Sequence, residues 1–173
     1  SPVADAAMRA DLDKVRLLLK GGADVNVAQG DGMTALHWSA ENRSVEMAAM
    51  LIYAGANVEA VTRIGGYTPL HLASRSGSAA IIQELLEAGA DPAVRSSTGG
   101  ATPVHFAASA SSKESVTSLL DHGAEIDARE SAWEQTPLIF AASLGRTEIV
   151  ELLLNRGADV SVTTSTVYLP ALQ

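Results

Sequence analysis

Cysteine is absent from this chain, so it can form neither a disulfide framework nor a thiolate metal site. Aromatic side chains are scarce, at 4% of the residues, whereas apolar residues make up 47%. A core must therefore be built mainly from alanine, leucine, valine and isoleucine. Long apolar runs are also missing: the run from Met47 to Ala54 is far shorter than the roughly 20 residues of a membrane-spanning helix. We therefore expect no membrane span.

Positive charge is in short supply. Twelve basic side chains stand against twenty acidic ones, which gives a formal net charge of −8. Binding to a phosphate backbone depends on Lys and Arg displacing counterions, so this balance opposes nucleic acid as a partner. Solubility alone would explain the acidity, and a basic partner is the alternative.

Two short motifs recur along the chain at a nearly constant interval. The first is a Thr-Pro-Leu-His type of stretch, best preserved at Thr68-Pro69-Leu70-His71, and the second is a Gly-Ala-Asp type of triplet. The threonines are Thr34, Thr68, Thr102 and Thr136, and the triplets begin at Gly22, Gly55, Gly89, Gly123 and Gly157. A period in this range predicts a solenoid of supersecondary units.

Each unit carries local signals for two helices. A Thr can cap a helix through its hydroxyl, and a Pro at the first helical position, as in Thr68-Pro69, suits that place. A second helix is predicted to follow a short break, with one apolar face such as Val45, Ala48, Leu51 and Ile52. The glycine of the triplet would end that helix, because it takes a left-handed conformation without steric cost.

The Thr-Pro-Leu-His start, the Gly-Ala-Asp end and the spacing together resemble the ankyrin repeat family. The residues of the repeats resemble those of bacterial members more than those of animal members. The resemblance implies an all-α ankyrin-repeat solenoid of stacked helix-turn-helix units with projecting hairpin-like loops. It predicts an ankyrin repeat domain over 1–162, with an amino-terminal capping repeat, and a non-repeat tail over 163–173. The repeats are expected at about 1–28, 29–61, 62–95, 96–129 and 130–162.

The last three connecting loops depart from the family's usual unit. They carry one residue more than the first loop, near Thr62, Ser96 and Glu130. We therefore expect the geometry of their tips to differ from the family pattern.

Nothing in the sequence indicates chemistry. His37, His71 and His105 occupy one position of successive repeats, and stacked helices about 8–10 Å apart cannot bring them around a single metal ion. Each is expected to bond the first turn of its own unit and the loop beside it. The serines lack a Gly-x-Ser-x-Gly setting, and the Gly-Gly pairs lack the Lys-Ser/Thr of a phosphate loop. We expect no catalytic, cofactor or metal site, and hence no enzyme.

The family's binding mode implies a partner surface made of loop tips and the exposed side of the first helices. Ile64, Tyr67 and Trp133 stand out, because large side chains on polar loops are typical of binding hot spots. The alternative for Tyr67 and Trp133 is that each ring folds back onto the adjacent loop. Trp38 is predicted to belong to the core. The full surface is Gly30, Asp31, Met33, Ile64, Tyr67, Ala101, Trp133 and Gln135 on the loops, with Glu41, Asn42, Arg75, Ser76, Ser109, Ala110, Ser143 and Leu144 on the helices.

The resemblance implies a non-catalytic scaffold that binds another protein, of unknown identity, through loop tips and the concave face. A regulatory or targeting subunit associated with an enzyme or a larger complex is the alternative. The first residues, Ser1-Pro2-Val3-Ala4, lack Met and already belong to a repeat, as they would after removal of a signal peptide. We therefore expect a periplasmic or secreted bacterial protein, with a cytoplasmic one as the alternative.

Overall fold

The protein is a row of paired helices. The computed structural model describes residues 1–164, and this part contains ten α-helices and no strand. The first helices of the pairs are α1 (Pro2–Met8), α3 (Ala35–Glu41), α5 (Pro69–Ser76), α7 (Pro103–Ala110) and α9 (Pro137–Ser143). The second helices are α2 (Leu12–Lys20), α4 (Val45–Tyr53), α6 (Ala79–Glu87), α8 (Lys113–Asp121) and α10 (Thr147–Asn155). Most of the predicted tail over 163–173 lies outside the described residues.

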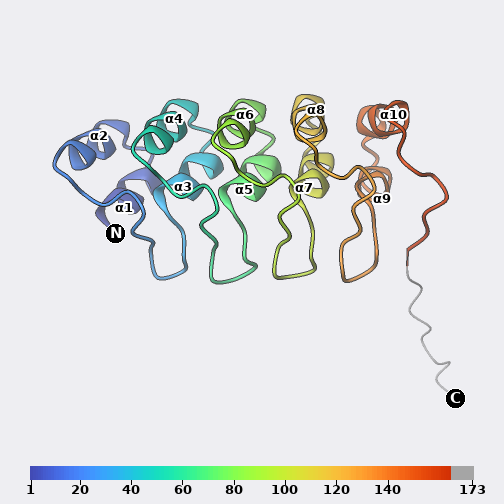
Figure 1. The fold of residues 1–173 in the computed structure, drawn as a ribbon, viewed down its shortest axis with the longest axis horizontal. Helices are drawn as coiled ribbons and strands as arrows, with labels where there is room; N and C mark the ends of the chain where they lie inside the picture. Colours follow the sequence, from blue (N-terminus) through green and yellow to red (C-terminus); the bar gives the residue numbers. More distant parts are fainter. Residues whose placement is uncertain (165–173) are drawn as a thin grey trace, which may run out of the picture.

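The helices form two layers, and the connecting loops project from one side (Figure 1). Along the inner layer, α1 packs on α3, α3 on α5, α5 on α7 and α7 on α9. In the outer layer α4, α6, α8 and α10 pack in the same order, and each outer helix also packs on the inner helix of its own pair. The all-α solenoid with projecting loops is therefore confirmed.

The first helices begin at the repeated threonines, as predicted. The side chain of Thr68 accepts a hydrogen bond from the backbone N–H of His71, and Pro69 occupies the first turn. Thr34, Thr102 and Thr136 are the corresponding caps of α3, α7 and α9. A left-handed residue then separates the two helices of each pair: Ala10, Arg43, Gly77, Ser111 and Gly145 all have positive φ angles.

The core lies between the two layers. It contains Leu36 and Leu70 from the inner helices and Met47, Leu51 and Leu85 from the outer ones, all with side chains closed to solvent. The predicted apolar face of α4 is partly wrong, because Val45 is exposed and Met47 is buried instead. Val45 directly follows the N-cap Ser44, and the buried residues of this helix are Met47, Ala48 and Leu51.

None of the helices in residues 1–164 is long and apolar enough to cross a membrane.

Candidate functional site

The repeated histidines are built into the stack. The backbone N–H of Thr68 donates to Nδ1 of His71 across 3.1 Å, so Nδ1 is unprotonated and the other ring nitrogen carries the hydrogen. That nitrogen, Nε2, donates to the carbonyl oxygen of Ala101 in the next loop across 3.2 Å. His37 and His105 make the corresponding bonds to the carbonyls of Tyr67 and Gln135. Each histidine therefore ties its own helix to the following loop, as predicted.

Burial keeps these imidazoles neutral. Desolvation lowers the pKa of His71 to about 4, and it also lowers the pKa of His37 and of His105. No group of three His, Cys, Asp or Glu side chains in residues 1–164 is placed to hold a metal ion. The histidines are thus structural groups of the stack.

One side chain organises each of the three longer loops. Thr62 Oγ1 donates to the carbonyl of Ile64 and accepts from the N–H of Tyr67. Ser96 makes the corresponding two bonds in its loop. The carboxylate of Glu130 accepts from three backbone N–H groups, at 2.6, 2.7 and 3.1 Å. The extra residue is thereby accommodated, and the large side chains at the loop tips are held on a defined backbone.

Backbone hydrogen bonds join successive loops into one surface. The N–H of Arg63 donates to the carbonyl of Asp31 across 2.8 Å, and the N–H of Ser97 donates to that of Gly65 across 2.8 Å. The fourth loop continues the series through Ser131 and Gly99. The loops and the adjoining side of the first helices therefore form a continuous surface, which we call the inner face.

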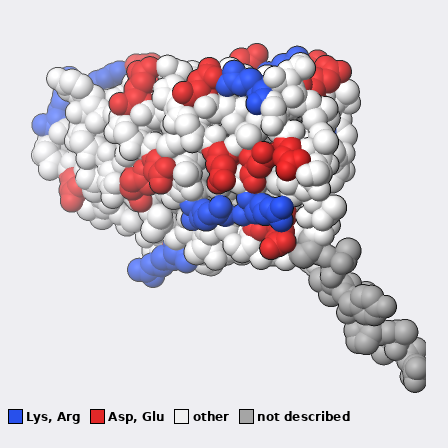
Figure 2. All heavy atoms as spheres, turned by 45° about the vertical axis from the view of Figure 1, so that its right-hand side comes forward, with Lys and Arg blue, Asp and Glu red and all other residues white. Residues whose placement is uncertain are grey.

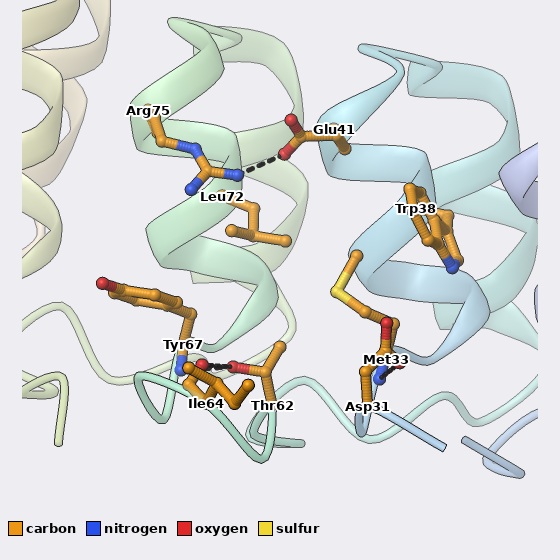
Figure 3. A pocket seen from close by; sticks show the side chains of 9 residues that line it. All are labelled: Asp31, Met33, Trp38, Glu41, Thr62, Ile64, Tyr67, Leu72 and Arg75. Atoms are coloured by element: carbon orange, nitrogen blue, oxygen red, sulfur yellow. Dashed lines mark hydrogen bonds and ion pairs between the residues drawn. The ribbon is translucent and has the colours of Figure 1, made fainter. Parts of the chain in front are cut away.

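A hollow opens on the inner face between α3 and α5 (Figure 3). It has a volume of about 350 Å³. Met33 and Leu72 lie between the two helices, and the loop residues Asp31 and Ile64 lie at its lower end (Figure 3). At the upper end the Arg75 guanidinium reaches across to Glu41, with 2.7 Å between Nη2 and Oε2. The complete lining is Asp31, Met33, Trp38, Glu41, Thr62, Ile64, Tyr67, Leu72 and Arg75.

Six of the predicted partner-binding residues converge on this hollow, although they come from two loops and two helices. They are Asp31, Met33, Glu41, Ile64, Tyr67 and Arg75. Gly30 lines a second hollow that adjoins the first through Asp31 and Trp38.

Four other predicted residues are engaged in holding repeats together. Asn42 donates to the carbonyl of Ala7 across 2.9 Å, and Ser76 donates to that of Ala40 across 3.0 Å, each in the preceding repeat. The carbonyls of Ala101 and Gln135 accept the histidine bonds described above. Their polar groups therefore serve the stack itself.

The remaining predicted residues lie further along the stack. Ser109 and Ala110 are half-buried on α7, and Ser143 and Leu144 are exposed at the end of α9. Trp133 lies on the loop before α9 with half of its surface exposed. None of these five lines the hollow between α3 and α5.

Trp38 corrects the sequence prediction. It was expected in the core, but it is only half-buried and lines both hollows, with its indole N–H donating to Gln29 across 2.7 Å. The short helix α3 already buries Leu36, His37 and Ala40, so few positions remain to face the loops. The shortness of this helix was the feature of the sequence that could have placed Trp38 on the side of the loops. Leu72, at the same position of the next repeat, is buried yet also reaches the hollow.

The ring of Tyr67 packs against neighbouring residues and also lines the hollow. Its ring meets those of His71 and Phe106 edge-on, with centroids 5.9 and 5.7 Å apart. It also lies so close to Gly65 that a methyl group there would overlap it. The ring therefore packs on its own loop and the next repeat while one side lines the hollow.

On the face of the stack that Figure 2 shows, acidic side chains form a row across the repeats, with a smaller group of basic ones below. Around the first hollow the carboxylates are Asp31 and Glu41, and the single cation, Arg75, is already paired with Glu41. The hollow thus combines an apolar floor with net negative charge.

Comparison with protein families gives a match over most of the chain. Residues 3–96 and 94–164 match the family model described as ankyrin repeats (3 copies). A comparison with curated proteins found no match.

Proposed function

We propose that this chain, which belongs to the ankyrin repeat family, is a non-catalytic scaffold that binds a partner protein through its inner face. Ankyrin repeats are in general protein–protein interaction modules. The observation that carries the proposal is the hollow between α3 and α5 with its apolar floor, together with large apolar side chains exposed on the loops of the same face. Ile64 is 83% exposed and Trp133 50% exposed, both on loops whose backbones are fixed by hydrogen bonds.

Exposure of such side chains to water is unfavourable in free energy, and their burial against a partner is favourable. Large apolar and aromatic anchors on a rigid frame supply most of the affinity in protein interfaces, because little conformational entropy is lost when they are buried. The loops meet this condition, since Thr62 and Glu130 fix their tips and the histidines fix their bases.

Affinity capture with matched variants tests the proposal. The purified chain is used as bait in an extract of its source, beside an Ile64→Ser/Trp133→Ala variant of the inner face and a Glu87→Ala/Glu151→Ala variant of the outer helices. Captured proteins are quantified by mass spectrometry. A partner that is lost with the first variant and retained with the second supports binding through the inner face.

Circular dichroism of both variants confirms that they remain folded. A partner that survives the inner-face substitutions and is lost with the outer ones would place binding on the opposite side of the stack and overturn the proposal.

A further inference from the structure

The hollow between α3 and α5 also constrains the chemistry of what it binds. We propose, resting on the function above, that it receives a partner segment that inserts one large apolar side chain and places a Lys or Arg beside Asp31. Three features of the hollow lead to this: its size, its floor and its unmatched charge.

The size suits a side chain. A volume of about 350 Å³ holds roughly a dozen water molecules. It lies at the lower end of the range of about 300–1,000 Å³ for small-molecule sites. One leucine, methionine or aromatic residue with its flanking backbone would occupy such a space.

The floor favours an apolar occupant. Met33, Trp38 and Leu72 come together from α3, α5 and the first loop, and Ile64 extends this surface at the tip of the second loop (Figure 3). Methionine fills irregular gaps and adapts to different partners. Water on this floor has few polar groups to bond, so its displacement by an apolar side chain is favourable.

The negative charge at the loop end of the hollow favours a basic side chain on the partner. Asp31 is exposed, forms no ion pair within residues 1–164, and uses Oδ1 to accept the N–H of Met33. Asp5 lies across the second hollow, which Asp31 also lines, but its carboxylate is paired with the N-terminal ammonium of Ser1 across 3.5 Å. A hydrogen bond from Gln29 lowers the pKa of Asp5, so it is ionised at neutral pH. Within residues 1–164, Asp31 is therefore the carboxylate at the loop end of the hollow that has no ionic partner.

The end of the hollow away from the loops does not favour a further charge on the partner. The Glu41–Arg75 pair joins α3 to α5 there, so the charges at that end are already balanced. A cation on the partner is thus favoured at the loop end, one or two positions from the inserted apolar residue, since an extended chain advances about 3.3 Å per residue.

A random peptide library displayed on phage tests this directly. The full chain is immobilised, bound phage are sequenced, and enriched peptides are synthesised for measurement of Kd by fluorescence anisotropy. We expect enrichment of peptides with a Leu, Met or aromatic residue within two positions of Lys or Arg. Enrichment of acidic peptides, or no enrichment, would overturn the proposed chemistry.

Variants locate the binding. Ile64→Ser removes an exposed apolar contact and should weaken binding about tenfold. Asp31→Asn keeps the oxygen that accepts from Met33 but removes the charge; it should weaken binding about fivefold and flatten its salt dependence. Tyr53→Ser, on α4 where Tyr53 is 95% exposed, is the matched control and should change nothing.

The results separate this inference from the broader function. If Ile64→Ser and Asp31→Asn leave peptide affinity intact, the hollow is not the site and the inference fails. If a native partner is nevertheless lost with the Ile64→Ser/Trp133→Ala variant, the scaffold function stands without it.

Discussion

The Nε2 of His71 lies 3.2 Å from the carbonyl oxygen of Ala101, which is 30 residues further along the chain. The bond crosses from the first helix of one repeat to the loop of the next, and its neighbours on His37 and His105 repeat it along the stack. A buried imidazole thus fixes the position of the last three loops relative to the helices. The arrangement of the inner face depends on these contacts.

His71→Ala should destabilise the fold by about 3 kcal/mol. The substitution leaves a cavity and removes the partners of Thr68 N–H and Ala101 C=O at a site that is 1% exposed. Urea denaturation measures the effect. His122→Ala is the control, because His122 is exposed at the end of α8 and makes one bond, to Ser118. Equal effects of the two substitutions would contradict the structural role of His71.

Stability should fall as the pH is lowered from 7.5 to 5. The unfolded state binds a proton at each histidine near pH 6.5, whereas the folded state resists protonation because the pKa of His71 is about 4. The stability that His71 contributes is therefore complete above pH 6.5 and is lost progressively below it. The loss at pH 5 should be about 2 kcal/mol from His71 alone.

Urea midpoints at several pH values check this, with His71→Gln as the comparison. The variant should show a shallower pH dependence, because one of the depressed pKa values is gone. A midpoint that stays constant between pH 7.5 and 5 would show that the histidines titrate normally in the folded protein.

Arg43→Gly should stabilise the protein by about 1 kcal/mol. Arg43 holds a φ of 56° between α3 and α4, a conformation that costs a residue with a Cβ about 1–2 kcal/mol. Gly77 occupies the same place between α5 and α6 with a φ of 69°. Gly77→Ala is thus the reciprocal change and should lower stability by a similar amount. Thermal unfolding of both variants tests the pair, and a lower Tm for Arg43→Gly would refute it.

Tyr67→Ala and Trp133→Ala should each weaken binding of the partner by about 2 kcal/mol or more. Their effects on stability should differ. Tyr67 packs on His71 and Phe106 and should lose stability as well, whereas Trp133 is half exposed and should not. Glu87→Ala and Glu151→Ala, on the exposed side of α6 and α10, should leave binding unchanged. Calorimetric titration with the captured partner measures all four.

The sequence by itself determined the repeats, the helix starts and the role of the histidines. These features are local or strictly periodic. Thr68 caps a helix within one turn, and a histidine such as His71 stands at the same distance from the threonine in successive repeats. The one-residue extension near Thr62, Ser96 and Glu130 was also evident, although not that these side chains would organise their loops from within.

Only the tertiary structure decided which side chains reach the inner face. Trp38 and Leu72 occupy equivalent positions in successive repeats, yet Trp38 is half-buried and Leu72 is buried. Asn42 and Ser76 were predicted to face a partner, but they bond carbonyls about one repeat away. The Glu41–Arg75 pair likewise joins two repeats. Such contacts depend on how far one repeat is rotated against the next, and packing of the two helix layers sets that rotation.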